Sequence, residues 1–450
     1  MVVQKFGGTS VADADAIRRL IEIVRAARLR DGRGPAVVVS AMSKVTDTLL
    51  AIAAHAGAGR MDEALGLVEQ LRQRHLKVAG ELAPAAGDLA ADISAELDGL
   101  GAIVRALAVL REVSPRTLDV IAAMGELLSS RVVAAALDAA GIPSAWIDAR
   151  QAIVTDAEHT RALPLGAETN AAIARLIVPV LDRQAVPVAG GFVGATVDGH
   201  TTTLGRGGSD FSGALVGAGI GAREIQIWTD VDGMLTADPR VVAEPRLVPH
   251  LSFDEAAELA YFGAKVLHPS TILPAVERNI PVRILNSRNP GGTGTIITAQ
   301  PPASSMPLAG LASKRDVTVV DITSSRMLMA YGFLRRVFEI FERFTTAVDV
   351  VATSEVTVSV TIDDLRNLDA IVAALSEFAT VTVERDMALL CAVGDRLRNE
   401  PEIAARAVGL LEEVPLRMIS QAASRRNITV ILRQADLPQA MHRLHEEFFG

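Results

Sequence analysis

The sequence predicts an α/β protein in which a largely parallel sheet lies between helices, followed by two smaller α+β units. Three observations predict this class. From Val2 to about Ile297, short β-branched runs alternate with longer segments of helical period. At 300–307 the sequence QPPASSMP interrupts the pattern with paired prolines and small polar residues, as a linker does. Beyond it the order of predicted elements becomes β-α-β-β-α-β and nearly repeats, which is typical of two small units in tandem.

The first region supplies six predicted strands. They are Val2–Lys5, Ala36–Ser40, Ser144–Asp148, Val186–Gly191, Glu224–Asp230 and Val282–Asn286. Helical periodicity predicts helices over Asp13–Arg30, Asp62–Ala79, Thr117–Ala140 and Thr169–Arg183. This alternation favours a parallel sheet with both faces covered. Because ligands of such sheets bind beside the carboxyl ends of the strands, motifs at strand ends carry the most weight.

The domain boundaries that we predict follow these changes in composition and in the order of predicted elements. The α/β domain is expected at 1–299, the linker at 300–307, and the two small units at 308–385 and 386–450. The repeat is visible in EVTVSV and NITVIL, where Val356 and Ile428 stand 72 residues apart in matching places.

Composition narrows the class of ligand and the compartment. The net charge of −9 argues against nucleic acids and anionic membranes as partners, and favours small soluble ligands. The single cysteine, Cys391, cannot form an internal disulfide, and no secretory signal is recognisable, so we expect a reduced, cytoplasmic protein. Apolar stretches such as Ala185–Ala189 are far shorter than the roughly 20 residues of a membrane span.

Glycine is concentrated at 190–221, where it accounts for 11 of 32 residues. Such a run between a strand and a helix places bare amide groups near a helix N-terminus, which suits an anion such as phosphate. A flexible turn is the plain alternative. The segment TLGRGGSD adds Arg206, Ser209 and Asp210. A guanidinium group suits a carboxylate or phosphate, and a carboxylate can organise cations around transferred phosphate.

Three further charged residues have both a functional and a plain interpretation. Lys5 ends the first strand just before Gly7–Gly8, where a cation faces phosphate oxygens or is simply solvated. Glu126 lies inside an apolar helix, where it is either exposed on one face or held for a ligand amine. Lys265 precedes a His-Pro pair, and is either a nucleotide contact or a surface charge.

Familiar signatures of other site classes are missing from the sequence. Neither the G-x-x-x-x-G-K-[ST] pattern nor G-x-G-x-x-G is present, and H-E-x-x-H, C-x-x-C and G-x-S-x-G are absent too. We therefore expect no resident metal. An enzyme with this sequence is expected to work by positioning and charge rather than through a covalent intermediate.

Taken together, these stretches resemble the aspartate kinases of the amino acid kinase family. The motifs that carry the resemblance are KFGGTSV at 5–11, VVSAMSKVTD at 38–47, GELLSS at 125–130, GGFVG at 190–194, TTTLGRGGSD at 201–210, IWTDVDGMLTADPR at 227–240 and FGAKVLHP at 262–269. The paired small units look like the tandem ACT domains of this family. The resemblance therefore implies an amino acid kinase fold followed by two ACT-like βαββαβ domains.

The resemblance also implies a reaction and the residues that perform it. Aspartate kinases transfer the γ-phosphoryl group of MgATP to the β-carboxylate of L-aspartate, as the first step toward lysine, threonine and methionine, with Mg²⁺ held mainly by the nucleotide phosphates. Catalytic roles are implied for Lys5, Gly7, Gly8 and Asp210. Substrate contacts are implied for Ser40, Thr46, Glu126, Gly191, Phe192, Arg206 and Ser209. ATP contacts are implied for Lys5, Phe6, Gly7, Gly8, Thr229, Asp230, Leu235, Arg240, Lys265 and Val266.

The C-terminal half resembles the lysine-sensitive members of the family. Lysine contacts are implied for Met327, Gly332, Phe333, Leu334, Val348, Asp349, Ser354 and Glu355, and pairing of ACT-like domains implies a homodimer. Three positions depart from the relatives: Leu235 replaces a frequent aromatic residue, Lys44 a commoner glycine, and Met329 a histidine found in some. A relaxed or altered response to the effector is therefore the alternative to inhibition by lysine.

Two other functions compete with this interpretation. One is another acyl-phosphate-forming kinase of the same superfamily that uses glutamate or a related acid. The other is a catalytically silent amino-acid sensor. GELLSS and TLGRGGSD argue against the first, and an intact set of Lys5, Glu126, Arg206 and Asp210 argues against the second.

Overall fold

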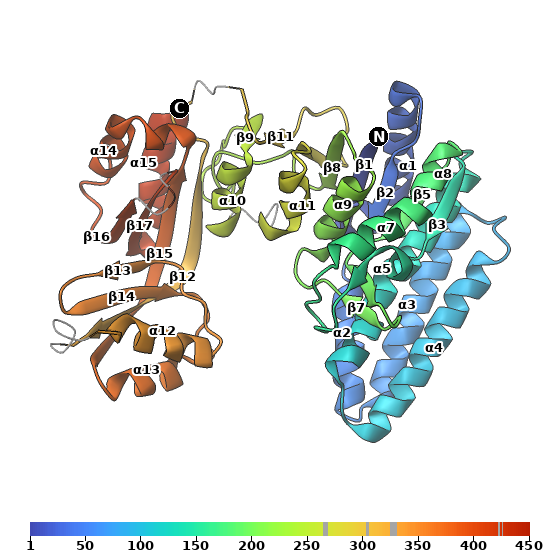
Figure 1. Ribbon diagram of the computed structural model, residues 1–450, viewed down its shortest axis with the longest axis horizontal. Coiled ribbons are helices and arrows are strands. Elements are labelled where there is room, and N and C mark those ends of the chain that lie inside the picture. Colours follow the sequence, from blue (N-terminus) through green and yellow to red (C-terminus); the bar gives the residue numbers. More distant parts are fainter. Residues whose placement is uncertain (264–268, 303–305, 325–330, 422–423, 425) are drawn as a thin grey trace. The chain divides into compact units, whose positions relative to one another are not determined.

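The computed structural model of the chain describes residues 1–263, 269–302, 306–324, 331–421, 424 and 426–450 (Figure 1). The chain forms two compact units. The first consists of Met1–Met234, Pro249–Phe253 and Val266–Pro301. The second consists of Leu235–Val248, Asp254–Lys265 and Pro302–Gly450.

An eight-stranded sheet organises the first unit, with the strand order β3-β5-β2-β1-β8-β10-β11-β9. Its strands are β1 (Val2–Phe6), β2 (Ala36–Val39), β3 (Ser144–Ile147), β5 (Val186–Gly190), β8 (Glu224–Thr229), β9 (His250–Ser252), β10 (Val282–Asn286) and β11 (Thr295–Thr298). The six predicted strands are consecutive in this order, and each neighbouring pair among them is parallel. The predicted α/β architecture is therefore confirmed. A small second sheet holds β4 (Val154–Thr155), β6 (Val193–Thr196) and β7 (Thr201–Thr203).

The helices of this unit are α1 (Ala14–Asp31), α2 (Val45–Gly57), α3 (Met61–Leu82), α4 (Leu89–Leu110), α5 (Pro115–Ala139), α6 (Ala149–Ala152), α7 (Gly166–Leu176), α8 (Val178–Asp182), α9 (Gly208–Gly219) and α11 (Leu273–Glu277), with short 3-10 turns η1 (Gly8–Val11) and η2 (Pro269–Ile272). Three of the four helices predicted from periodicity are found in this unit as α1, α3 and α5, and the fourth, Thr169–Arg183, is divided into α7 and α8. Local signals set their ends. Asp13 caps α1 by accepting a hydrogen bond from the Ala16 amide, and Gly32 ends it in the left-handed conformation.

Side-chain alternation along β1 decides what each face of the sheet meets. Phe6 points into the large core that also contains Val37, Val39 and residues of α1 to α5. Lys5 points to the opposite face, toward α9. There a Cβ on Gly213 would lie only 3.2 Å from Lys5 Cβ, so glycine lets α9 pack closely on the strand. This alternation places the Lys5 side chain under the first turn of α9.

Helix α5 is the one helix in the described part of the chain that is long and apolar enough to cross a membrane. However, 83% of its most apolar window is buried inside the fold. Ile121, Leu128 and Val132 belong to the main core. Its apolarity is therefore explained by packing within the unit.

The second unit is built on a six-stranded antiparallel sheet with the order β13-β14-β12-β15-β17-β16. Its strands are β12 (Gly310–Thr323), β13 (Val351–Thr353), β14 (Thr357–Ile362), β15 (Thr380–Val393), β16 (Leu416–Gln421) and β17 (Asn427–Arg433). Its helices are α12 (Phe333–Arg343), α13 (Leu368–Ser376), α14 (Pro401–Gly409) and α15 (Leu437–Phe449), with turns η4 (Asp395–Arg398) and η5 (Gln434–Asp436). Most of α10 (Phe253–Tyr261) also belongs to this unit.

The two βαββαβ repeats share their longest strands, which differs from the predicted tandem order. The C-terminal half of β12 pairs with the N-terminal half of β15 in the first repeat, while Gly310–Lys314 pairs with Leu389–Val393 in the second. The second repeat therefore obtains its last strand from residues that precede the first repeat. Asp316 and Asp386 adopt positive φ angles of 58° and 57°, so each long strand bends where it passes between repeats.

Two segments that the predicted boundary at residue 299 places in the α/β domain lie in this second unit. The backbone amide of Leu311 donates to the carbonyl oxygen of Thr236 at 2.7 Å, and Asn427 donates to Glu258 at 2.6 Å. Ala237 and Val242 belong to the core under the second repeat. These long-range contacts could not be read from a local change of composition.

Candidate active site

The Lys5 side chain is held by a carboxylate at the carboxyl end of β1. Its Nζ lies 2.6 Å from Oδ1 of Asp210, which stands in the first turn of α9. The two side chains are only 8% and 15% exposed. A buried lysine needs such a partner, because an unpaired charge away from water costs several kcal/mol. The pair fixes the direction of the ammonium group.

The two glycines after β1 differ in what their amides do. The Gly7 amide donates to the Trp228 carbonyl oxygen at 2.9 Å, so it is engaged within the sheet. In this arrangement the Gly7 amide is therefore not available to a phosphate oxygen, which argues against a catalytic role for that amide. Gly8 begins the turn η1, and a Cβ there would lie 3.0 Å from the Ala41 carbonyl oxygen. No partner of the Gly8 amide is found among the described residues.

Glu126 is a buried acid on α5. Its side chain is 4% exposed, and its Oε2 atom meets no hydrogen-bond partner in the described part of the chain. Burial raises its pKa to about 8, although the Ala41 backbone and the charge of Lys5 oppose that rise. A Cβ on Gly190 would come 2.9 Å from the Glu126 carbonyl oxygen, so β5 ends tightly against α5. An unpartnered acceptor of this kind suits a ligand ammonium group.

Gly7, Gly8 and Glu126 line one pocket of about 550 Å³ at the carboxyl edge of the sheet. Lys5 and Asp210 are not among its lining residues, but Lys5 Nζ lies next to the pocket, 3.8 Å from where a Cβ on Gly7 would stand. The residues that line it are Gly7, Gly8, Thr9, Ser40, Ala41, Met42, Ser43, Lys44, Thr46, Asp47, Glu126, Phe192, Gly205, Arg206, Gly207, Gly208, Ser209, Thr229 and Asp230. Segments that are distant in sequence thus meet where the parallel topology predicts. Thr9, Ser43 and Asp47 were not predicted, although each lies within a quoted motif.

The other predicted substrate residues contribute to the pocket in different ways. Arg206 is exposed at the pocket and has no ion pair among the described residues. Ser40 and Ser209 share a hydrogen bond of 2.9 Å between their hydroxyl oxygens. A Cβ on Gly191 would lie 2.6 Å from Ser209 Cβ, so Gly191 acts through the space it leaves. Phe192 lines the pocket with a positive φ of 65°.

Lys44 lines the mouth of the same pocket in a conformation that usually belongs to glycine. Its φ angle is 65°, at the N-cap of α2, and its side chain is exposed. A residue with a Cβ pays about 1 kcal/mol or more for this left-handed conformation. A glycine would adopt this conformation without that cost.

A buried network around Asp119 was missed by sequence reasoning. Asp119 lies about two turns before Glu126 on α5, and its carboxylate is 2.7 Å from His159 Nδ1 and accepts the Thr203 hydroxyl at 2.5 Å. It also accepts the Thr160 amide at 3.0 Å. The network anchors the end of β7 to α5, and the loop that follows carries Arg206. No local pattern signals it, because its members are dispersed in the sequence.

The predicted ATP residues fall into several groups. Thr229 is the last residue of β8, Asp230 follows it, and both line the pocket. The Phe6 side chain is fully buried and stacks on Trp228, with ring centroids 6.1 Å apart, so a side-chain contact of Phe6 with a nucleotide is excluded. Arg240 and Leu235 belong to the second unit.

Arg240 is engaged there, since its guanidinium donates to the Asp238 carboxylate at 2.6 to 3.1 Å. Leu235 bridges to Leu247. Lys265 and Val266 lie outside the described residues. Among the described residues no group of three or more His, Cys, Asp or Glu side chains gathers to hold a metal ion.

The predicted effector residues belong to the second unit. Gly332 is the left-handed N-cap of α12, Phe333 is buried in the core beneath the first repeat, and Leu334 is partly exposed. The Phe333 side chain thus contributes to packing. Met327 lies outside the described residues.

The remaining effector residues cluster around β13 and β14. Val348 packs on the same core, and the Ser354 hydroxyl accepts the Thr357 amide at 3.1 Å in the turn where Glu355 is exposed. Asp349 is buried and already carries an internal cation, since its Oδ1 accepts from Lys314 Nζ at 2.7 Å.

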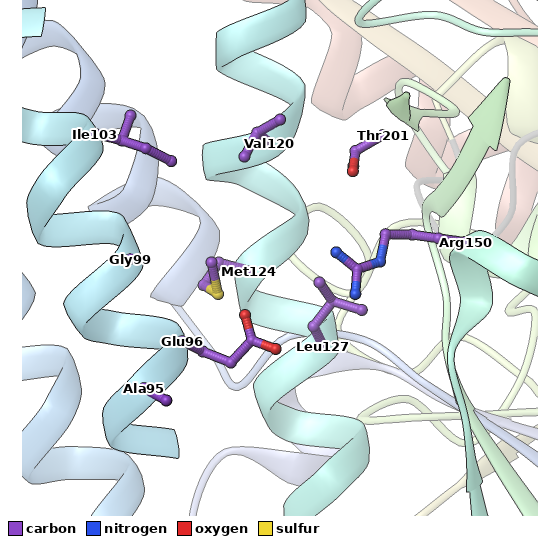
Figure 2. Close-up of a pocket in the computed structure, with 9 residues that line it drawn as sticks. All are labelled: Ala95, Glu96, Gly99, Ile103, Val120, Met124, Leu127, Arg150 and Thr201. Atoms are coloured by element: carbon purple, nitrogen blue, oxygen red, sulfur yellow. The ribbon is translucent and has the colours of Figure 1, made fainter. Parts of the chain in front are cut away.

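A second pocket, of about 200 Å³, lies between α4 and α5 (Figure 2). Figure 2 shows the side chains of Ile103, Val120, Met124 and Leu127 along the two helices, with Glu96 and Arg150 beside them. Arg150 is saturated by the Asp148 carboxylate at 2.7 to 3.1 Å, and Glu96 accepts from Arg131 at 3.3 Å. Its polar groups are therefore already paired, unlike Glu126 and Arg206.

Known proteins of similar sequence belong to the family that the motifs of this site indicate. Residues 1–286 match the model of the amino acid kinase family, and residues 390–448 match an ACT domain. The chain is 39% identical to aspartokinase 3, chloroplastic, of Arabidopsis thaliana, over 99% of this chain and 81% of the relative. It is 35% identical to the lysine-sensitive aspartokinase 3 of Escherichia coli, over 100% and 99% of the two chains.

Solved structures of aspartokinases are also similar to this chain over its full length. The structure of E. coli aspartokinase III in complex with aspartate and ADP in the R-state has a TM-score of 0.85 at 33% identity, with both chains fully covered. That of the same enzyme with lysine and aspartate in the T-state has a TM-score of 0.84 at 34% identity, again with full coverage. The fold, the pocket and these full-length similarities together show that the chain belongs to the aspartokinase family, whose members are kinases that phosphorylate aspartate.

Proposed function

We propose that the 550 Å³ pocket binds L-aspartate and the γ-phosphate of MgATP and forms 4-phospho-L-aspartate and ADP. The observation that carries the assignment is the unpartnered Oε2 of buried Glu126 in the same pocket as the free guanidinium of Arg206. One is an acceptor for an α-ammonium group, and the other is a paired donor for an α-carboxylate. An α-amino acid satisfies both at once.

The chemistry then requires charge rather than proton transfer. A β-carboxylate oxygen is ionised at neutral pH and attacks the γ-phosphorus, the bond from phosphorus to the bridging oxygen of ADP breaks, and ADP leaves with that electron pair. Lys5, oriented by Asp210, faces the transferred group and stabilises the negative charge that develops on it. The Gly8 amide supports the same oxygens. Thr229 and Asp230 receive the nucleotide, and Mg²⁺ is carried in on its phosphates.

The test is direct. Purified protein with MgATP, L-aspartate and hydroxylamine should produce aspartyl hydroxamate, and L-glutamate should not replace L-aspartate. Folded protein that forms no hydroxamate would remove the proposed reaction. Hydroxamate from glutamate at equal rate would instead identify a different acyl-phosphate-forming kinase.

We also infer that L-lysine inhibits the enzyme through the first βαββαβ repeat. Support comes from the similarity to a lysine-sensitive relative and from the buried carboxylate of Asp349. Adding lysine to the hydroxamate assay tests this, since unchanged activity at saturating lysine would exclude inhibition.

Assembly and compartment are proposals of the same kind. The six-stranded sheet ends in the edge strands β13 and β16, and edge strands are commonly covered by a partner, which supports a homodimer through the ACT-like unit. Sedimentation as a monomer at assay concentration would contradict it. Cys391 is buried, and burial raises its pKa to about 12, which fits a structural thiol in a reducing cytoplasm. Titration of the unfolded protein, as isolated from the cell, should find one free thiol per chain, which would support that compartment.

A further inference from the structure

Lys314 is a partly buried cation held between two acids in the second unit. It stands on β12, and its Nζ lies 2.7 Å from Asp349 Oδ1 and 3.5 Å from Asp363 Oδ2. The Lys314 side chain is 20% exposed and that of Asp349 only 6%, whereas Asp363 is half exposed. The lysine therefore has one enclosed partner and one that solvent reaches.

The enclosed partner is only half satisfied. Oδ2 of Asp349 is buried and, apart from the neighbouring Tyr261 hydroxyl group, meets no hydrogen-bond donor in the described part of the chain. Buried polar atoms are nearly always paired, and leaving one unpaired costs about 1 to 3 kcal/mol. Asp349 thus retains acceptor capacity for a further donor although it already binds one ammonium group.

Lys314 also connects this acid to the end of α10. Its Nζ lies 5.0 Å from the centroid of the Tyr261 ring, within the range of a cation–π contact. Burial first, then the nearby charge of Asp349 and a hydrogen bond to its carboxylate, raise the pKa of Tyr261 to about 12. Two residues further, a Cβ on Gly263 would lie 2.2 Å from the Ser313 carbonyl oxygen, so the end of α10 fits closely against β12. The ion pair and this close approach lie on consecutive residues of β12.

We propose that Lys314 is an internal ammonium group that competes with an amino-acid effector for Asp349. This inference rests on the proposed inhibition by lysine at Asp349. The effector ammonium takes the Asp349 carboxylate, and Lys314 Nζ moves to Asp363, which is already within 3.5 Å. The exchange replaces one ammonium–carboxylate pair by two, so no charge is left buried without a partner. Because Lys314 leaves Asp349, its contact with Tyr261 changes, and binding is transmitted to the end of α10.

The experiment measures lysine binding to the full-length protein by calorimetry, in the absence of nucleotide. Lys314→Met removes the competitor and should tighten lysine binding about tenfold, the order expected for one charge-assisted hydrogen bond. Lys314→Arg keeps a cation and should bind lysine within about twofold of the parent, as a retained competitor requires. Lys77→Met is the matched control, because Lys77 is exposed on α3 and has no ion pair among the described residues.

Lysine binding that is unchanged or weaker in Lys314→Met would overturn the proposal. If the parent does not bind lysine measurably, binding gained in Lys314→Met supports it, and binding absent from both variants overturns it. Should Lys314→Met fail to fold, Asp363→Asn provides a second test. It removes the acceptor to which Lys314 moves, and should weaken lysine binding about threefold on the same scale. Unchanged binding in that variant would contradict the exchange.

Failure of this inference is distinguishable from failure of the proposed function. The calorimetric readout needs no turnover, whereas the reaction is judged by hydroxamate formation. Hydroxamate formed by a protein whose Lys314→Met variant binds lysine like the parent would leave the kinase intact and remove only the competition.

Discussion

Each unit of the molecule contains a largely buried lysine–aspartate pair, and the more exposed partner is Asp210 in the first pair and Lys314 in the second. In the first unit Lys5 meets Asp210 at 2.6 Å, and in the second Lys314 meets Asp349 at 2.7 Å. In the proposed reaction the lysine acts on the transferred phosphoryl group and the aspartate orients the lysine. At the proposed effector site the aspartate is the working group and the lysine occupies it. The same ion pair thus serves preorganisation in one place and competition in the other.

The largest expected effect comes from breaking the first pair. Lys5→Met should lower kcat for aspartyl phosphate formation by about 10²- to 10³-fold, the loss typical of one preorganised donor to a charged transition state. The KM for aspartate should change much less, because the contact strengthens mainly in the transition state. Steady-state kinetics measures both, with Lys77→Met as control. A rise in KM with unchanged kcat would contradict the role of Lys5, and the comparison with Lys314 would lose its first half.

A smaller effect concerns a third buried ionisable group, Glu126, which has no ion-pair partner in the described part of the chain. Its pKa of about 8 means that the carboxyl group is neutral at pH 7 in the free enzyme. An ammonium ligand needs the carboxylate, so the KM for aspartate should fall about tenfold per pH unit as pH rises toward 8, then level off. Glu126→Gln should raise KM and lose this slope. A parent KM that is independent of pH between 6 and 8 would contradict the expectation.

Glu126 also makes the stability of the fold depend on pH. Its folded pKa lies above the ordinary value of 4.5, so the stabilisation is fully present below pH 4.5 and is lost as pH rises through about 8. In thermal unfolding of the ligand-free protein, the Tm of Glu126→Gln should therefore rise relative to the Tm of the parent as pH rises.

The smallest expected effect concerns a lysine without an acidic partner, Lys44. It has no ion pair in the described part of the chain and holds a φ of 65°. Lys44→Gly should stabilise the protein by about 1 kcal/mol by relieving that conformation. Denaturant unfolding measures the free energy change. A loss of stability would show that the Lys44 side chain, unlike its backbone, contributes to the fold.

Much of the catalytic unit follows from local sequence patterns. Six apolar runs predicted six consecutive parallel strands, and motifs at their ends predicted most of the pocket, because parallel topology brings strand ends together. The residues that were misjudged depend on contacts that no local pattern encodes. The Gly7 amide is taken by Trp228, and Phe6 points to the core, although both belong to a correctly recognised motif.

Other features depend on partners that are distant in sequence. Asp119 acts through His159 and Thr203, and Asp349 through Lys314. A motif names residues, but it does not say which of their groups are already engaged. For that reason the predicted positions of the site were more reliable than the predicted contacts.

The shared strands of the ACT-like unit affect how the chain is made. Gly310–Lys314 leaves the ribosome more than 70 residues before Leu389–Val393, its partner in the second repeat. At about 5 to 20 residues per second, this strand waits about 4 to 15 seconds for that partner. Meanwhile the whole first repeat emerges and can form in between. The first repeat can therefore fold before the second repeat is complete. Once it has folded, it brings Gly310–Lys314 near Leu389–Val393, so this long-range pairing closes a shorter effective loop.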